Sequence, residues 1–357
     1  MSFDTGRCRI SALESAMFRT AIILFLLVGG STVTALPAQE PAHGPLEVSI
    51  GELDGPEHAT FGLIRSVDVD SDGYIYVADE QASSIRVFDS QGEYVTSAGR
   101  QGAGPGEFNT IRGMAVGPDD LLHVADAGNG RISTFERTLE DLEFRTSRRL
   151  DFQPDDVCVL GNRMYVLAQP LDPTGPMVRE VDQEGRVLRG FGDPYRPRGD
   201  ERERIGDWNH MRNWGFVTCD EGTGSVILLH QYAPIVRAFS ADGQEAWTTE
   251  LDEYLELEFL VTRGECCMYR TDPSLGVNHE GFAVTTDGAG HVFVGLQEAG
   301  PNRWDHRRFE ARVLAVDSGD ELGVQAPTGG LVTRVTQDRL YTWVRDPYPQ
   351  VRVYSAR

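Results

Sequence analysis

The sequence predicts an all-β fold, a six-bladed β-propeller built from four-stranded antiparallel sheets. Three observations carry this prediction. The chain repeats itself at a fixed offset of 47 residues, and each repeat contains four short strand-like runs. Weaker copies of the same pattern continue to the end of the chain. Repeats of about 40 to 50 residues with four strands each are typical of propellers, whose ring of sheets removes most open edges.

The repeat is clearest between residues 61–88 and 108–135. Matching pairs at the offset of 47 residues are Phe61 and Phe108, Ile64 and Ile111, Arg65 and Arg112, Val77–Asp79 and Val124–Asp126, and Ile85 and Ile132. In the first copy the runs RSVDV, YIYVAD, SIRVFD and YVTSAG alternate with turn-forming groups such as DSDG. Both faces of these runs are apolar, which indicates that each sheet is covered by a neighbour on either side.

Counting copies gives six blades and the domain organisation. The expected blades cover about 61–100, 108–150, 155–192, 213–251, 280–325 and 331–357. The last copy stops after its third strand, and the prediction uses residues 46–51 (LEVSIG) as its outer strand, which closes the ring. We therefore expect a propeller over residues 46–357, a linker over 39–45 and a signal peptide over 1–38.

The glycine-rich segment GRQGAGPGEF, Gly99 to Phe108, is not a phosphate-binding loop, because a strand-like run follows it in place of Lys-Ser/Thr and a helix. We expect it to lead from the outermost strand of one blade to the innermost strand of the next. In this prediction Phe108 anchors adjacent blades, and Phe61 does so one blade earlier. Asp79 and Asp126 end their second strands, where a carboxylate accepts backbone N–H bonds of the following turn.

The stretch from Gly99 to Phe135 resembles an NHL repeat. It carries the G-x-G-x-G-x-F crossover, the Val-Ala-Asp strand and the Asn-x-Arg-Ile continuation, here Asn129, Arg131 and Ile132. Later copies keep the alternating strands and lose most of the motif letters. The resemblance implies a six-bladed propeller of the bacterial exported kind. Such folds mostly serve as recognition discs, and related six-bladed propellers include lactonases and a lyase with a metal in the central channel.

The net charge and the N-terminal segment limit the expected partners and location of the protein. The net charge of −22 argues against a nucleic-acid partner and against an anionic membrane surface. The apolar stretch Ala21 to Gly30 follows Arg19 and is shorter than the about 20 residues that cross a bilayer, so it fits a secretory signal. Cleavage after Ala35 or Ala38 is expected. The sequence therefore predicts a periplasmic or secreted protein with no membrane insertion after cleavage.

Four cysteines remain after removal of the signal peptide: Cys158, Cys219, Cys266 and Cys267. One or two disulfides are expected in an oxidising compartment. Because adjacent cysteines rarely bond to each other, the favoured pairing joins Cys266 or Cys267 to Cys219 or Cys158. The alternative is that all four are buried thiols.

Candidate site residues lie where the loops lead into the innermost strands. They are Arg65, Arg112, His210, Arg212, Trp214, His279 and Glu280, with Asp155 and Asp156 beside them. Arginines that converge on an axial pocket favour a carboxylate or another anionic group. The alternative for Arg65 and Arg112 is structural, since residues repeated at one blade position often bond a neighbouring blade's carbonyl groups.

No nucleophile motif such as G-x-S-x-G is present. The leading hypothesis is therefore an exported, non-enzymatic propeller that uses no cofactor and binds a partner protein, peptide or glycan on one face. The insertions 193–213 and 252–280 are candidate partner surfaces. The alternative is a metal-assisted hydrolase or lyase that holds calcium or zinc in the central channel through His210, His279, Glu280, Asp155 and Asp156.

Overall fold

A computed structural model describes residues 43–168, 175–195, 213–233, 235–251, 258–262, 265–270, 278–299, 309–325 and 330–356. For residues 258–262, 265–270, 278–280, 298–299 and 324–325 the description covers the backbone alone. The chain divides into two units, Met1–Gln39 and Glu40–Arg357, and every described residue belongs to the second. The expected signal peptide and most of the expected linker therefore lie outside the described residues. In the described part of the chain no helix has the length and hydropathy needed to span a membrane.

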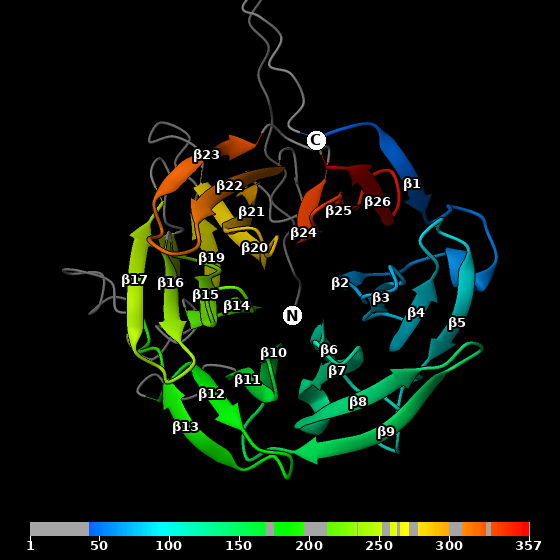
Figure 1. The fold of residues 1–357 in the computed structure, drawn as a ribbon, viewed down its shortest axis with the longest axis horizontal. Helices are drawn as coiled ribbons and strands as arrows, with labels where there is room; N and C mark the ends of the chain where they lie inside the picture. The colour runs from blue at the N-terminus through cyan, green and yellow to red at the C-terminus, as the bar shows by residue number, and fades with distance from the viewer. Residues whose placement is uncertain are drawn as a thin grey trace, which may run out of the picture. The chain divides into compact units, whose positions relative to one another are not determined.

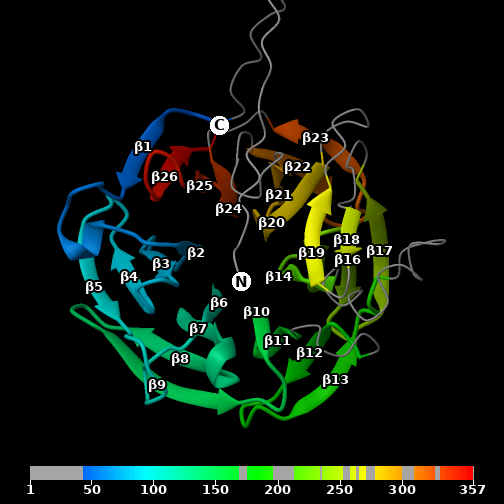
Figure 2. The same ribbon diagram turned by 180° about the vertical axis from the view of Figure 1, so that it is seen from behind.

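Six four-stranded antiparallel sheets confirm the predicted blades, which we number 1 to 6 in chain order (Figures 1 and 2). Blade 1 holds β2 (Ile64–Val69), β3 (Ile75–Asp79), β4 (Ser84–Phe88) and β5 (Tyr94–Ala98). Blade 2 holds β6 (Ile111–Val116), β7 (Leu121–Asp126), β8 (Arg131–Arg137) and β9 (Leu142–Arg149). Blade 3 holds β10 (Pro154–Leu160), β11 (Arg163–Ala168), β12 (Val178–Val181) and β13 (Val187–Phe191).

The remaining blades follow the same order. Blade 4 holds β14 (Gly215–Asp220), β15 (Ser225–His230), β16 (Ile235–Ser240) and β17 (Glu245–Glu250). Blade 5 holds β20 (Asn278–Thr286), β21 (His291–Ala299), β22 (Phe309–Ala315) and β23 (Glu321–Gln325). Blade 6 holds β24 (Leu331–Val335), β25 (Arg339–Val344), β26 (Gln350–Ser355) and β1 (Leu46–Ile50). A separate hairpin joins β18 (Glu258–Thr262) to β19 (Glu265–Arg270), and two short 3-10 helices are η1 (Glu57–Ala59) and η2 (Ala127–Asn129).

Blade 6 contains strands from both ends of the described chain. β1 is its outermost strand and pairs antiparallel with β26, so that Leu46 lies opposite Tyr354 and Ile50 lies opposite Val351. The amide of Gly44 extends this pairing by donating to the carbonyl of Ser355 over 2.8 Å. Residues more than 300 positions apart in the chain are thus joined in one sheet.

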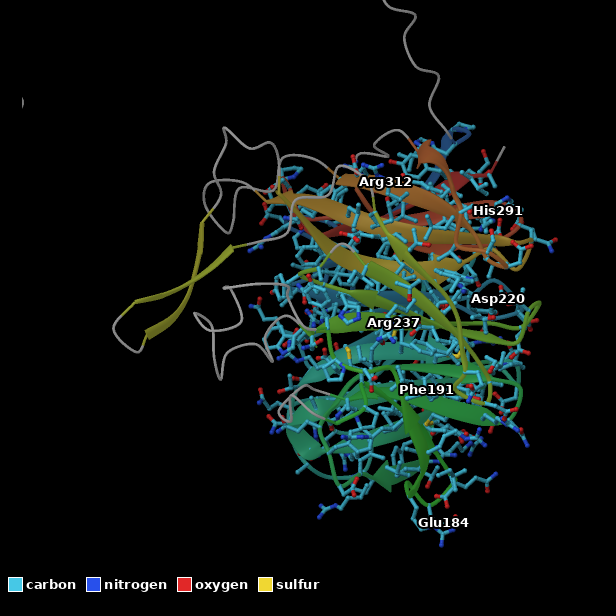
Figure 3. The ribbon with its side chains drawn as sticks, turned by 90° about the vertical axis from the view of Figure 1, so that its left-hand side faces the viewer. Glu184, Phe191, Asp220, Arg237, His291 and Arg312 are labelled. Carbon is cyan, nitrogen blue, oxygen red and sulfur yellow. A yellow bond between two sulfur atoms is a disulfide. The ribbon has the colours of Figure 1, made fainter. Side chains whose placement is uncertain are left out.

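Apolar side chains fill the spaces between neighbouring blades. Phe108, at the end of the glycine-rich crossover, is fully buried among residues of blades 1 and 2, and its ring lies 5.6 Å from that of Phe135. Phe61 packs against Phe88 in the same way, with 6.1 Å between ring centroids. The anchoring role predicted for both residues is confirmed. Between blades 3 and 4 the ring of Phe191, which is labelled in Figure 3, lies 5.1 Å from that of Phe239 between centroids.

Four hairpin turns share one hydrogen-bonding pattern. An aspartate at the first turn position accepts the amide hydrogens of the residues two and four positions later. The aspartates are Asp70, Asp89, Asp182 and Asp287. In the turn after Asp70, Gly73 adopts a φ of 84°, which a residue with a Cβ rarely reaches. These turns explain the spacing of Asp and Gly in the repeats.

Asp79 and Asp126 hold the segment that leads into the innermost strand. Asp79 accepts the amides of Gly62 and Leu63 over 2.9 and 3.0 Å, in addition to the amide of Ala82 in the following turn. Asp126 similarly accepts the amides of residues 109 and 110. The predicted bond to a backbone N–H of the following turn is thus seen for Asp79, whereas Asp126 accepts the side-chain amide of Asn129 there. Their larger contribution is to fix the crossover against its own blade.

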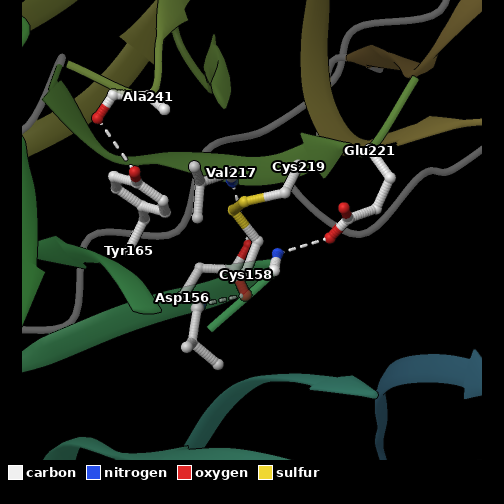
Figure 4. Close-up of a disulfide and its surroundings, with 9 residues drawn as sticks. Asp156, Cys158, Tyr165, Val217, Cys219, Glu221 and Ala241 are labelled. Carbon is white, nitrogen blue, oxygen red and sulfur yellow. Dashed lines mark hydrogen bonds between the residues drawn. A yellow bond between two sulfur atoms is a disulfide. The ribbon is translucent and has the colours of Figure 1, made fainter. Parts of the chain in front are cut away.

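A disulfide joins Cys158 on β10 to Cys219 on β14, with 5.5 Å between the Cα atoms (Figure 4). The favoured pairing in the sequence analysis, from Cys266 or Cys267 to one of these residues, is therefore wrong. The physical reason is that β10 and β14 are innermost strands of neighbouring blades, so residues 61 positions apart face each other across the blade interface. The side chains of the adjacent pair lie outside the described residues.

Replacement of both Cys158 and Cys219 by alanine should lower the free energy of unfolding by about 4 kcal/mol. The bond closes a loop of 61 residues and so removes conformational entropy from the unfolded chain. Urea titration checks this value. A dithiol reductant should lower the urea midpoint of the unaltered protein and leave the midpoint of the double variant unchanged. Equal unfolding midpoints for the two proteins would contradict the prediction.

Candidate functional site

The innermost strands β2, β6, β10, β14, β20 and β24 surround the axis of the ring (Figure 1). We call the face where these strands begin the upstream face and the face where they end the downstream face. A narrow space of about 80 Å³, the axial channel, is lined by residues of all six strands. A larger space of about 730 Å³, the downstream cavity, is lined by the last residues of the inner strands and the turns after them.

Five of the six inner strands contain a one-residue bulge, where two residues face one on the neighbouring strand, and in β2, β6 and β10 the bulge lies at the second residue of the strand. The extra residues are Arg65, Arg112, Asp155, Phe282 and Thr333. A bulge turns its side chain away from the regular alternation, and bulges often lie beside functional sites. Three of the predicted site residues therefore hold equivalent positions in neighbouring blades. Sequence reasoning missed the bulges because the runs were read as unbroken strands.

The contacts of Arg65 agree with the alternative interpretation, in which it bonds a carbonyl group of the neighbouring blade. Its Nε donates to the backbone carbonyl of Arg112 in the next blade over 3.0 Å, and it lies 3.9 Å from the carboxylate of Glu80. Arg112 extends this series to blade 3, because its Nε lies 3.9 Å from Asp155. The guanidinium of Arg112 also lies 5.8 Å from the ring of Trp214. The structure thus brings Arg112, Asp155 and Trp214 together near the upstream face.

Asp155 and Asp156 are buried carboxylates with different surroundings. Burial raises the pKa of Asp155, while the charges of Arg65 and Arg112 lower it. Asp156 accepts the amides of Val157 and Val217 over 2.9 and 3.0 Å, and burial raises its pKa to about 7 despite these two bonds. The carboxylate therefore links β10 to the inner strand of blade 4 (Figure 4).

Gly113 in β6 makes room for that carboxylate. A Cβ at this position would lie 2.0 Å from Oδ1 of Asp156, closer than two atoms can approach. The absence of a side chain in one inner strand thus allows the buried acid of the next blade to reach the axis. This provides a packing reason for a glycine inside a strand.

Asp68 and Arg334 form the boundary between the two spaces. Both residues line the axial channel and the downstream cavity. Asp68 accepts the amide of Val69 on Oδ1 over 2.8 Å and the amide of Val116 on Oδ2 over 2.7 Å, and Nε of Arg334 lies 3.0 Å from Oδ1. The pair links blade 6 to blade 1, and Asp68 links blade 1 to blade 2. The sequence analysis missed both residues, although each is a charged residue within an otherwise apolar strand.

The downstream cavity lies at the opposite end of the inner strands from the predicted site residues. Five blades line it, through residues 68–73, 90, 115–118, 120, 158–159, 218–219, 221, 334, 336–339 and 341. Cys158 and Cys219 form part of its wall, so the disulfide fixes two blades at the edge of the cavity.

Several predicted site residues cannot be placed. His210 and Arg212 lie outside the described residues, and of His279 and Glu280 only the backbone in β20 is described. Their convergence stays a prediction. Among the side chains that the structure describes, no group of three or more His, Cys, Asp or Glu residues is arranged to hold a metal ion.

Comparisons with known proteins agree with this architecture. Residues 46–179 match the model of a family described as a six-bladed β-propeller. Similar solved structures include a member of the DUF4221 family from Bacteroides vulgatus, with 12% sequence identity and a TM-score of 0.56 over 88% of this chain and 98% of that one. A Bacteroides fragilis protein whose name proposes that it is exported shares 10% identity, with a TM-score of 0.55 over 90% and 97% of the two chains.

The protein is a six-bladed β-propeller. The virginiamycin B lyase of Staphylococcus aureus also aligns, at 11% identity and a TM-score of 0.49 over 85% of this chain and 82% of that one. A comparison with curated proteins found no match. Identities this low show the fold alone, and function has to be argued from the site.

Two buried groups make opposite contributions to the pH dependence of stability. Burial lowers the pKa of His123 to about 4, below the ordinary value of 6.5 for an unburied histidine. The folded protein therefore becomes more stable as the pH rises between these two values, because only the unfolded chain keeps the proton there. The raised pKa of Asp156 works the other way, since the folded protein retains a proton that the unfolded chain releases above about pH 4. The two effects partly cancel in the unaltered protein, and a difference measurement separates them.

We expect Asp156→Asn to remove the second effect. The unfolding free energy of the unaltered protein, measured relative to this variant, should fall by about 1.4 kcal/mol per pH unit between about pH 5 and pH 7. Urea unfolding of both proteins across this range checks the slope. A difference that stays constant with pH, or that grows in favour of the unaltered protein, would contradict it.

Proposed function

We propose that this protein is an exported, non-enzymatic propeller that binds a partner protein, peptide or glycan on its downstream face. The observation that carries the proposal is the downstream cavity of about 730 Å³, which opens where five inner strands end. Its volume falls within the range of about 300 to 1,000 Å³ that is typical of ligand pockets.

The walls of this cavity are held together before any partner arrives. Asp68 bonds the inner strand of blade 2, Arg334 pairs with Asp68, and the disulfide joins blades 3 and 4. A partner would therefore meet a preformed site and would not have to order it, which favours binding. Fixed walls of this kind suit the recognition of a partner.

Two observations support export. A disulfide between inner strands is typical of proteins in an oxidising compartment such as the periplasm or the extracellular space. A similar Bacteroides fragilis structure carries a name that proposes export. The side chains of His210, His279 and Glu280, on which the metal-assisted alternative depends, lie outside the described residues.

Photocrosslinking from the cavity tests the proposed function. Gln337 lines the cavity and is exposed, whereas Leu139 lies outside the lining and is 89% exposed. A photoreactive amino acid at position 337, in protein exported by its native host, should yield a defined adduct in affinity capture with mass spectrometry. The same group at position 139 is the control. No adduct from position 337, or identical adducts from both positions, would overturn the proposal.

A further inference from the structure

We infer that the downstream cavity recognises a peptide segment rich in lysine and arginine. The inference rests on the proposed function and names the chemistry of the partner. It follows from the charge of the cavity lining, from the separation of its exposed carboxylates among different blades, and from the hydrogen-bond donors at its floor.

The lining carries six carboxylates and two guanidinium groups, an excess of four negative charges. The carboxylates are those of Asp68, Asp70, Asp72, Asp120, Glu221 and Asp338, and the cations are Arg334 and Arg339. A cleft lined by one sign of charge focuses the field and raises the local concentration of oppositely charged ligands. An anionic partner would be repelled, and a cationic partner would be attracted.

Three of these carboxylates are exposed and come from three different blades: Asp72 from blade 1, Glu221 from blade 4 and Asp338 from blade 6. Each uses only one oxygen atom within the described part of the protein. Asp72 pairs with Arg137 over 2.7 Å, while Glu221 accepts a backbone amide and Asp338 accepts a threonine hydroxyl. The second oxygen of each is therefore available to a ligand.

The other lining carboxylates are already committed to the fold. Asp70 is buried and accepts the hydroxyl of Tyr76 and Nε of Arg137. Asp120 accepts both the amide and the hydroxyl of Ser71. The binding charge is thus carried by a rim of separated carboxylates. In the described residues no three such groups are close enough to share one metal ion, whereas a chain with several cationic side chains can contact all of them.

The lining favours a peptide over a glycan. Aromatic surfaces are the usual platform on which sugar rings pack, and the one aromatic residue in the lining, Tyr341, is only 2% exposed. At the floor, Arg334 uses Nε towards Asp68, and its terminal nitrogen atoms donate no hydrogen bond to any described residue. Guanidinium N–H groups suit the carbonyl oxygens of a peptide backbone. Backbone carbonyls at the floor and cationic side chains at the rim complement this arrangement.

Binding of fluorescent hexalysine tests the inference, with hexaglutamate as the charge control. The test variant combines Asp72→Asn, Glu221→Gln and Asp338→Asn, which keep side-chain shape and one acceptor oxygen each. The matched control combines Glu140→Gln, Asp151→Asn and Glu250→Gln, which are exposed, lie outside the cavity and change the net charge equally. We expect the test variant to weaken hexalysine binding at least tenfold at about 150 mM salt, and the control less than twofold.

A second variant is independent of those substitutions. Gln337→Arg places a cation inside the cavity at an exposed residue that makes no hydrogen bond with the described residues, and it should also weaken hexalysine binding at least tenfold. Equal losses in the test and control triple variants would show diffuse attraction to an acidic protein and would overturn the inference. So would binding of hexaglutamate, or no effect of Gln337→Arg.

The two proposals fail separately. A crosslinked partner from position 337 together with unaltered hexalysine binding in both variants would leave the binding function standing and remove the cationic peptide. Hexalysine binding that depends on the rim, without any adduct from position 337, would remove the partner as proposed and leave the cation preference.

Discussion

The stability of the ring depends on how the backbone hydrogen-bonding groups at the inner edge of each sheet find partners. An innermost strand pairs on one side only, so half of its backbone N–H and C=O groups face the axis, where they need other partners. Asp68 and Asp156 each accept an amide from the next blade, and Arg65 donates to a carbonyl there. Side chains therefore replace the missing strand, and they join blades 1 and 2 and blades 3 and 4 at the axis.

This solution explains where the open space lies. The bulged side chains and the buried acids occupy the upstream and middle parts of the axis and leave a channel of only about 80 Å³. Beyond Asp68 and Arg334 the strands end, and the turns diverge around the larger cavity. The groups that satisfy the inner edges thus also form its floor.

The repeat at 47 residues was enough to predict the sheets, because turns such as the one after Asp70 and anchors such as Phe108 depend on local sequence. Contacts between blades were harder to predict. The partners of Asp68 are the amide of Val116, 48 positions away, and a guanidinium in blade 6. The predicted disulfide pairing was wrong for the same reason, since strand alternation alone does not show which inner strands face each other.

Repetition in the sequence marked two positions beside the axis. Arg65 and Arg112 recur at one blade position and do lie beside the axis, but one of them is committed to the next blade's backbone. The rim residues Asp72, Glu221 and Asp338 lie in turns, where an acidic residue is ordinary, so no sequence signal distinguished them. The role proposed for them in binding follows only from the position of several turns around one cavity.

Native-state hydrogen exchange of the amides of Val116 and Val217 tests the central claim most directly. Each of these amides donates to a carboxylate of the preceding blade. If these carboxylates lock the inner edges, both amides should exchange only through global unfolding, with the protection of the central strands of their sheets. Exchange through local opening, at rates close to those of exposed turn amides, would contradict the account.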